Sequence, residues 1–339
     1  MAAELRQMEQ SRWLFDHLLL MPKHEAWFRR EIAIKRAAAT TRIEGAELDE
    51  EAVASLEKGV PKAGLSEDEL ANVGALRAYE FIDYLSDIPD QPIDELVVRE
   101  INRNVLYGAS EVVTAGVYRN GQNTVGGKFT PPDQGDVADL MRSFGAWLRD
   151  SDTTIHPVIR AGLAHLHFVA IHPFWDGNGR TARGLATLIL QRSEFNFKRL
   201  LSVESVLLSV RDGYFTAIER TLGDKYSDDY DATAFVELFV RAVGSEVLSL
   251  QDRMTDWHRR LEELQAMVAS RNMRQRQVDG LLQAMQTGSI TRGEYLRMTK
   301  VSPVTASRDL AELVKEGFLK PNGETRNRVY LWVGSPAAS

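Results

Sequence analysis

The chain has 339 residues, more than one hydrophobic core usually serves, so we expect at least two domains. Its 44% hydrophobic and 26% charged residues are typical of a globular protein, not a disordered or fibrous one. It has no cysteine, which excludes disulfides, thiolate metal sites and cysteine nucleophiles. No apolar run approaches the roughly 18 residues of a membrane-spanning helix, and the N-terminal residues lack the signal-peptide pattern. We therefore expect a cytoplasmic protein without membrane contacts.

Helical patterns dominate most of the chain. Helical spacing of apolar residues, strong helix formers and N-cap residues predict helices at 4–20, 25–43, 67–85, 93–107, 136–148, 158–171, 180–191, 210–222 and 233 to about 270. Residues 116–132 differ, because glycines and the Pro131-Pro132 pair interrupt short apolar runs. That pattern indicates an irregular hairpin or flap. Strands and helices do not alternate, so a mainly α fold is expected.

The C-terminal part differs in charge and in pattern. From residue 271 onward there are 11 Lys and Arg against 6 Asp and Glu, an excess of +5 in a chain whose net charge is −7. This asymmetry is typical of a basic module attached to an acidic body. Helices are predicted at 278–285, 291–298 and 304–316, and a hairpin of 318–319 with 329–332 follows. Three short helices and a hairpin predict a winged helix-turn-helix.

An anion-binding pattern lies between two of the predicted helices. Gly177, Asn178 and Gly179 come directly before a helix, where unpaired backbone N–H groups and the helix dipole attract negative charge. Arg180 and Arg183 lie three residues apart on the helix surface, and their guanidinium groups suit phosphate oxygens. Together these residues predict a phosphate-binding site.

Two neighbouring residues suit phosphate transfer. Asp176 supplies a hard oxygen ligand for a Mg²⁺ ion that bridges phosphates. His172 can accept a proton from an incoming hydroxyl at neutral pH. The spacing Gly177-x-Gly179-x-x-Ala182 also fits a dinucleotide-binding loop, but that loop requires a preceding strand, and residues 158–171 have a helical pattern.

The segment from His172 to Arg183 resembles the Fic motif, His-x-Phe-x-(Asp/Glu)-Gly-Asn-Gly-Arg-x-x-Arg, at every defined position. The similarity extends over about residues 10–240 and includes Gly116-x-Tyr118-Arg119, which is similar to the start of the family's flap. It implies a Fic helical bundle with a short β-hairpin flap. It also implies a protein adenylyltransferase, which transfers AMP from ATP to a Ser, Thr or Tyr hydroxyl of a target protein, this chain itself included.

The family's roles transfer to this chain by motif position. His172 would be the catalytic base, Asp176 would hold Mg²⁺ on the α- and β-phosphates of ATP, and Phe174 would pack beneath the loop. The nucleotide-binding residues would be Gly177, Asn178, Gly179, Arg180, Arg183 and, at adenine, Tyr214. The flap that docks an extended target segment would be Gln122, Asn123, Thr124, Val125, Gly126, Gly127 and Lys128. Relatives are often dimers, so a homodimer is expected.

An N-terminal segment resembles the family's inhibitory motif, (Ser/Thr)-x-x-x-Glu-(Gly/Asn), through Thr40, Glu44 and Gly45. A glutamate at the C-terminal end of a helix opposes the helix dipole, so it needs an external cationic partner. The resemblance implies that Glu44 pairs with Arg183 and occupies the guanidinium that would otherwise hold the γ-phosphate. The chain would then belong to the class in which the inhibitory helix precedes the Fic core.

The C-terminal domain leaves two functions open. As a DNA-binding module it would present Thr305, Ser307 and Arg308 to a major groove and place Arg326 and Arg328 on the wing near phosphate. Domains of this kind also serve protein contacts or dimerisation. A second hypothesis for the whole chain is therefore a DNA-binding regulator whose Fic core senses nucleotide or removes AMP from targets.

These expectations divide the chain into four parts. An N-terminal helical region with the inhibitory helix would span residues 1–100, and the Fic catalytic core would span 101–240. A helical linker (241–273) would connect the core to the winged-helix domain (274–339).

Overall fold

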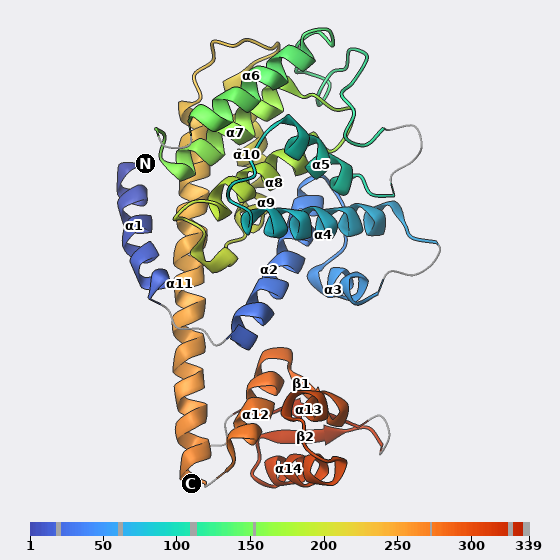
Figure 1. Ribbon diagram of the computed structural model, residues 1–339, viewed down its shortest axis with the longest axis vertical. Coiled ribbons are helices and arrows are strands. Elements are labelled where there is room, and N and C mark those ends of the chain that lie inside the picture. Colours follow the sequence, from blue (N-terminus) through green and yellow to red (C-terminus); the bar gives the residue numbers. More distant parts are fainter. Residues whose placement is uncertain are drawn as a thin grey trace. The chain divides into compact units, whose positions relative to one another are not determined.

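The computed structural model describes residues 1–17, 22–59, 64–108, 114–151, 154–271, 273–324 and 328–334. The described chain is mainly α-helical, as predicted, and it separates into two compact units, Met1–Gln251 and Asp252–Ser339 (Figure 1). Within the described residues, no helix combines the length and the apolar character that crossing a membrane requires.

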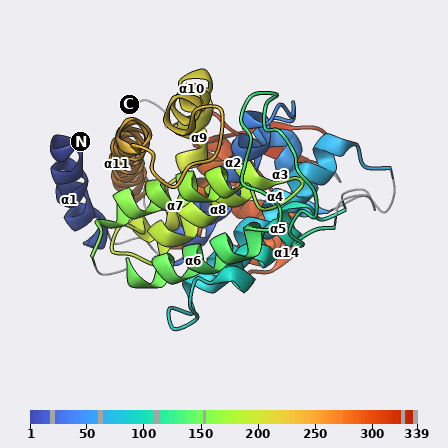
Figure 2. The same cartoon turned by 90° about the horizontal axis from the view of Figure 1, so that it is seen from above.

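The first unit is a bundle of helices. Its elements are α1 (Ala2–Asp16), α2 (Pro22–Ile43), α3 (Glu50–Lys58), α4 (Glu67–Ser86), α5 (Glu95–Val105), α6 (Val137–Asp150), α7 (Pro157–Ile171), α8 (Asn178–Gln191), the 3₁₀ turn η1 (Phe197–Arg199), α9 (Val203–Ser209), α10 (Arg211–Leu222) and the first part of α11 (Thr233–Ser270). The pair α7 and α8 forms its centre (Figure 2). Helices α4 and α5 pack against α8, α6 packs against α7, and α2 packs against α4 and α9.

Helix α7 is apolar on nearly every side, whereas α8 is buried together with polar side chains such as Arg183 and Thr187, which hydrogen-bond within the protein. Ala161 and Leu166 of α7, like Leu185 and Leu188 of α8, are completely buried. A helix that is apolar all round is stable only inside a protein. The loop that joins these helices, residues 172–177, therefore starts and ends in the buried centre of the bundle.

The predicted helices occur, with ends that differ by a few residues, and the segment 158–171 is helix α7 rather than a strand. Three short elements, α3, α9 and β1 (Ser289–Thr291), are not predicted, because they contain too few periods of a pattern. Helix α11 continues through Gly244, since a single glycine costs a helix only about 1 kcal/mol. Helix α8 begins at Asn178, two residues earlier than its pattern indicates.

The expected flap is a loop with one bridge rather than a regular hairpin. Val125 and Phe129 form an isolated antiparallel bridge, in which the Val125 N–H donates to the Phe129 carbonyl at 2.8 Å. The chain reverses between them through Gly126 and Gly127, both at positive φ. Thr130 then forms a parallel bridge to the segment after α10. Because Thr130 pairs with that segment, the two arms of the flap form no ladder beyond the single bridge.

The second unit contains the end of α11, then α12 (Gln275–Thr287), β1, α13 (Arg292–Thr299), α14 (Pro303–Lys315), β2 (Leu319–Asn322) and β3 (Val329–Trp332). Its strands form an antiparallel sheet in the order β1-β3-β2. The core of the unit includes Leu281, Tyr295, Leu310 and Phe318, all completely buried. Strand β2 extends through Pro321 and Asn322, residues that the hairpin pattern places in the turn.

Candidate active site

The loop between α7 and α8 forms a compact turn. His172 ends α7 in a left-handed conformation (φ 49°), and Gly177 caps α8 at φ 75°, a region that glycine enters freely. The side chain of Asn178 closes the turn, since Oδ1 accepts from the Phe174 N–H at 3.0 Å and Nδ2 donates to the Phe174 carbonyl at 2.8 Å. The Asn178 amide is therefore used to shape the loop, which leaves its backbone N–H for a ligand.

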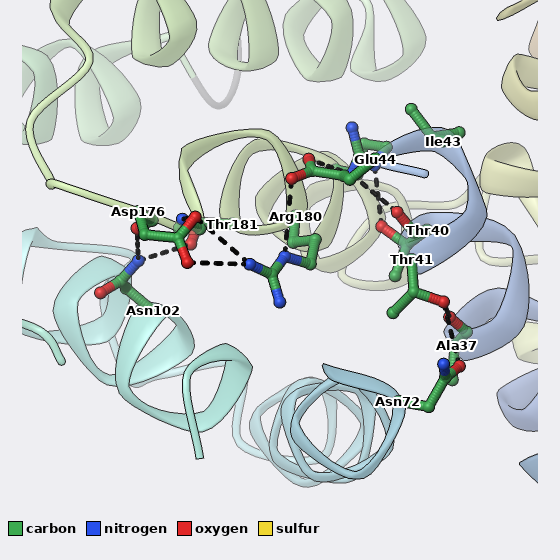
Figure 3. Close-up of polar contacts among 12 residues, drawn as sticks. Ala37, Thr40, Thr41, Ile43, Glu44, Asn72, Asn102, Asp176, Arg180 and Thr181 are labelled. Carbon is green, nitrogen blue, oxygen red and sulfur yellow. Dashed lines mark hydrogen bonds and ion pairs between the residues drawn. The ribbon is translucent and has the colours of Figure 1, made fainter. Parts of the chain in front are cut away.

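Asn102 of α5 ties this loop to the bundle from outside the motif. Its Nδ2 donates to the Asp176 carbonyl at 3.0 Å and to the Thr181 hydroxyl at 3.2 Å (Figure 3). Its Oδ1 accepts from the Gly116 N–H at 2.9 Å. Asn102 is completely buried. The motif does not predict this role. Its only sequence signal is an asparagine next to Ile101 on the apolar face of a predicted helix.

Arg119 holds the other side of the loop. Its Nε donates to the His172 carbonyl at 3.0 Å, and its Nη1 donates to the Gly121 carbonyl at 3.0 Å. Its backbone N–H donates to the Pro173 carbonyl at 2.9 Å. Arg119 is 2% exposed, so this guanidinium fixes backbone and does not reach solvent. It thereby joins the flap segment to the loop between α7 and α8.

A pocket of about 650 Å³ opens at the loop. Its lining includes His172, Asp176 and residues 177–179, and opposite them Phe215 and Ile218 of α10. The N–H groups in the first turn of α8 have no helical partner, and the positive end of the helix dipole lies there. The pocket therefore joins an anion-attracting end to an apolar wall, which suits a ligand with a phosphate part and an aromatic part.

His172 contributes a neutral imidazole to this pocket. Burial of the ring lowers the pKa of His172 from 6.5 to about 4, because an imidazolium loses hydration there. The ring is thus uncharged at neutral pH. In that form it can accept a proton from a hydroxyl group that enters the pocket.

The Arg183 guanidinium is bound to the end of α2. Its Nε donates to Thr40 Oγ1 at 2.8 Å, and its Nη2 donates to the Thr40 carbonyl at 3.0 Å and to Glu44 Oε1 at 2.7 Å. Glu44 Oε2 lies 3.7 Å from Arg180 Nε. Figure 3 shows Arg180 between Glu44 and Asp176. Asp176 Oδ2 lies 3.3 Å from Arg180 Nη2. The packing of α2 thus brings Glu44 to the two motif arginines.

Glu44 stands at the anion-attracting end of α8. A Cβ atom added to Gly179 would overlap with Glu44 Oε1, so the carboxylate lies directly against the first turn of that helix. Glu44 follows the C-terminus of α2, where a negative charge is unfavourable, and the dipole of α8 favours it instead. Burial opposes its ionisation, but the charges of Arg183 and Arg180 outweigh that effect and lower the pKa of Glu44.

Tyr214 lies behind Arg183. Its hydroxyl is 2.9 Å from His165 Nε2, and Arg183 Nη1 donates to it at 3.4 Å. Tyr214 is 1% exposed, and burial lowers the pKa of His165 to about 3. The hydroxyl is therefore occupied within the protein, while the adjacent Phe215 is 36% exposed in the pocket lining. Contact between Tyr214 and the adenine base stays a prediction.

Three of the seven predicted flap residues line the same pocket. Val125, Gly126 and Lys128 belong to its lining. Lys128 Nζ lies 3.3 Å from Glu219 Oε2 of α10, a pair of exposed side chains that connects the flap to the apolar wall. Gln122 turns inward instead, and its Nε2 donates to the Pro131 carbonyl at 2.9 Å.

Asp176 is the residue that fits a Mg²⁺ ion. Its side chain is 51% exposed and lines the pocket beside the first turn of α8. Within the described parts of the chain, no group of three or more His, Asp or Glu side chains lies close enough to hold a metal. Mg²⁺ often takes only one or two carboxylates and completes its shell with water and substrate phosphates. A single accessible carboxylate beside a predicted anion site is compatible with this kind of Mg²⁺ coordination.

The predicted DNA-binding residues lie in the second unit. Arg308 of α14 is exposed, and Thr305 and Ser307 on the same helix are half-buried. Arg328 is exposed directly before β3. Arg326 lies outside the described residues.

Residues 92–190 match the family model described as Fic/DOC, so the chain carries a Fic/DOC domain. It is similar to the protein adenylyltransferase fic-1 of Caenorhabditis elegans, with 36% identity over 200 residues, 56% of this chain and 38% of the relative. It is also similar to the protein adenylyltransferase Fic of Drosophila melanogaster, with 44% identity over 99 residues, 29% of this chain and 20% of the relative. The chain thus spans well under half the length of these relatives.

Solved structures show the same fold. A Fic family protein from Desulfovibrio desulfuricans G20 has a TM-score of 0.65 at 21% identity, over 98% of this chain and 96% of that one. Fic-1 of C. elegans has a TM-score of 0.62 at 28% identity, over 75% of this chain and 72% of that one. The first similarity spans both units, and its identity is low enough that it concerns the fold alone.

Proposed function

We propose that this chain is a protein adenylyltransferase, which transfers AMP from ATP to a Ser, Thr or Tyr hydroxyl of a protein. The observation that carries the proposal is the pocket in which the neutral His172 ring and the first turn of α8 meet. A proton acceptor beside an anion site is what attack of a hydroxyl on a phosphate requires. Further support comes from the relatives, which are named protein adenylyltransferases.

The reaction follows from the positions of these groups. His172 accepts the proton of the target hydroxyl, and the oxygen attacks the α-phosphorus of ATP. The bond from that phosphorus to the bridging oxygen of the β-phosphate breaks, so AMP remains on the target and pyrophosphate leaves. The N–H groups of the first α8 turn, with Arg180 and Arg183, offset the phosphate charge. Positioning and charge neutralisation of this kind provide most of the catalysis in phosphoryl transfer.

Asp176 would hold the Mg²⁺ ion that accompanies ATP. When bound, the ion would neutralise part of the phosphate charge. Asp176 also forms an ion pair with Arg180, whose guanidinium lies between this carboxylate and Glu44. The carboxylate that would hold the ion is therefore the same one that pairs with the Arg180 guanidinium.

We further propose that Glu44 inhibits this transfer. Its carboxylate lies against Gly179 and neutralises Arg183, the two groups that would receive a terminal phosphate of ATP. A phosphate and this carboxylate exclude each other there by overlap and by like charge. ATP then binds poorly, or with its phosphates displaced from the position in line with the target hydroxyl.

Labelling of wild type, Glu44→Gly and the double variant Glu44→Gly/His172→Ala tests both proposals. Each protein is incubated with Mg²⁺ and ATP labelled at the α-phosphorus, and a parallel series uses ATP labelled at the γ-phosphorus. Glu44→Gly is expected to raise the α-label about 10- to 100-fold, since a charge-assisted hydrogen bond of about 1.5–3 kcal/mol no longer occupies Arg183. The double variant should lose it, and the γ-series should stay blank.

Each proposal fails on its own result. An unlabelled Glu44→Gly protein would contradict AMP transfer, and label in the γ-series would indicate phosphate transfer instead. Equal α-label on wild type and Glu44→Gly would contradict inhibition by Glu44 but leave the transfer intact.

For the second unit we propose DNA binding by a winged helix-turn-helix. Support comes from the order α12-β1-α13-α14-β2-β3, in which α13 and α14 are joined by a short turn. Exposed Arg308 and Lys315 of α14 border an open pocket of about 560 Å³ with Arg274. The acidic Glu312 in this pocket accepts from Gln277 Nε2 at 2.8 Å, which directs its carboxylate toward α12. The helix therefore presents cations at a spacing of two turns.

Binding of the full chain to a random-sequence duplex measures this property. We expect the logarithm of the affinity to fall linearly with the logarithm of the salt concentration, and Arg308→Ala to reduce that slope by about one. Arg260→Ala is the matched control, since its guanidinium on α11 pairs with Asp256 at 2.7 Å. Binding that does not depend on salt, or no binding at all, would favour a protein-contact role for this unit.

A further inference from the structure

The segment between α8 and α9 contains an unusual backbone. Phe197, Lys198 and Arg199 are three consecutive non-glycine residues in the left-handed region, at φ 43°, 55° and 63°. Residues other than glycine avoid this region, because their Cβ atom approaches the following carbonyl oxygen. Strain of this kind persists only where the surrounding contacts fix it, and it often occurs at switches. The contacts that fix this turn therefore show what depends on it.

Helix α2 supplies hydrogen-bond donors to the carbonyls of this turn. Arg36 donates from Nε to the Leu201 carbonyl at 2.8 Å and from Nη2 to the Arg199 carbonyl at 3.0 Å. Arg29, two turns earlier on α2, donates from Nε to the Lys198 carbonyl at 3.2 Å. Arg36 is 2% exposed, so its guanidinium is confined to these partners and to nearby Asp83, at 3.7 Å. The two arginines, two turns apart, bind α2 to the strained turn and to the Leu201 carbonyl that follows it.

Helices α1 and α4 hold the turn from other sides. The Phe197 ring is 3% exposed and packs edge-on against Phe15 of α1, with centroids 5.3 Å apart. Arg199 pairs with the carboxylate of Asp87 on α4 and donates to the Asp83 carbonyl at 3.1 Å. The turn is thus anchored to α1 and α4, and α2 is attached to the turn.

Arg36 is aligned with the residues that bind Arg183. Arg36, Thr40 and Glu44 are four residues apart, so they follow one face of α2 and its end. At one end of this stripe Arg36 binds the strained turn, and at the other Thr40 and Glu44 bind Arg183. A helix transmits a displacement along its axis as a rigid body. A shift of α2 at the turn would therefore move Glu44 relative to α8.

We propose that Arg36 is a positioning residue for the inhibitory contact between Glu44 and Arg183, and that the strained turn limits how firmly α2 is held. The proposal rests on the proposed function. The bonds of Arg36 keep α2 where Glu44 reaches Arg183. Those bonds hold the turn on its α2 side, so relaxation of the left-handed backbone favours the state in which α2 has moved. The contact between Glu44 and Arg183 then inhibits the transfer, and a modest displacement of α2 breaks that contact.

Loss of the Arg36 guanidinium tests the positioning role. Arg36→Met keeps most of the side-chain volume and should raise the α-label of the otherwise wild-type protein at least about fivefold, the lower end of ordinary coupling between sites. In the Glu44→Gly protein the same change should add nothing, because the contact it positions is already gone. A merely structural role would lower the label in both proteins.

Arg30→Met is the matched control for this change. Arg30 lies on the same helix, but its side chain is 37% exposed, and its Nη2 lies 2.6 Å from Glu57 Oε2 of α3. Its loss should leave the label unchanged. Equal label in Arg36→Met, Arg30→Met and wild type would overturn the positioning role.

A second pair of variants tests the strain without loss of a buried charge. Lys198→Gly removes the side chain and relieves the left-handed conformation, whereas Lys198→Ala removes the side chain and keeps the Cβ atom. The carbonyl that Arg29 binds is present in both. Lys198→Gly should show about two- to fivefold less label than Lys198→Ala and a higher unfolding temperature. Equal label in the two variants would overturn the role of the strain.

The label on the Glu44→Gly protein distinguishes failure of this inference from failure of the proposed function. If it is labelled while the Arg36 and Lys198 variants behave like wild type, the inference is wrong and the proposed function stands. If it is not labelled, the proposed function itself is wrong, and the inference falls with it.

Discussion

Arg183 directs four of its five N–H groups at neighbours, two of them at Thr40 and one each at Glu44 and Tyr214. Only the bond to Glu44 must break to admit a phosphate. Thr40 and Tyr214 would still hold the guanidinium in place. A Glu44→Gly protein therefore retains a formed anion site, which is why removal of one carboxylate is expected to raise activity rather than to disorder the pocket.

The pH dependence of transfer should reveal the environment of His172. Because burial lowers its pKa to about 4, the ring is already neutral well below pH 7. The carboxylate of Glu44 acts to raise this pKa, so loss of its charge acts to lower the pKa. We expect the initial rate of the Glu44→Gly protein to stay nearly constant as the pH falls from about 8 to about 5. A loss of rate centred near pH 6.5, the ordinary value for histidine, would contradict a buried base.

The loop at residues 172–177 is held between α5 and α8 by a side chain outside the Fic motif. Asn102 of α5 joins the Asp176 carbonyl, the Thr181 hydroxyl and the Gly116 N–H. These contacts link the loop, the first turn of α8 and the start of the flap segment. The position of the anion site is therefore set by how α5 packs on α8.

Asn102→Ala should separate this link from the chemistry. Without the amide, buried backbone groups lose their partners, and the free energy of unfolding should fall by about 1–3 kcal/mol. The label on a Glu44→Gly/Asn102→Ala protein should fall as well, since the loop loses its fixed position. Asn104→Ala is the control, because Asn104 Nδ2 donates only within its own helix, to the Glu100 carbonyl at 2.9 Å. Urea denaturation measures the stability, and equal stability of the two variants would contradict the argument.

The molecule as a whole divides its candidate functions between its two units. Every residue proposed for AMP transfer and its inhibition lies within Met1–Gln251, and the exposed cations of α14 lie within Asp252–Ser339. The excess of +5 from residue 271 onward follows the same division. Changes at Arg308 should therefore leave transfer unaffected, and changes at His172 should leave DNA affinity unaffected.

The parts that sequence patterns predict well are those whose causes are local. Helix α4 begins where Ser66 and Glu69 form a capping box, and that box is present in the structure. The helix pattern that follows residues 177–179 places them at a helix N-terminus. The segment 172–183 is therefore enough to predict an anion site. The flap is predicted less well, because glycine permits several reversals and the neighbouring segment after α10 selects one of them.

The same contrast holds for the candidate site. The residues from His172 to Arg183 have fixed spacing in the chain, so their resemblance to the Fic motif follows from the sequence alone. Glu44 and Arg183 are 139 residues apart, and no local rule brings them together. The resemblance of Thr40–Gly45 to a known motif predicts that pair, but the roles of Asn102, Arg119 and Arg36 have no such pattern. Those contacts arise where helices pack side by side, because buried donors and acceptors must be satisfied by whichever element lies within reach.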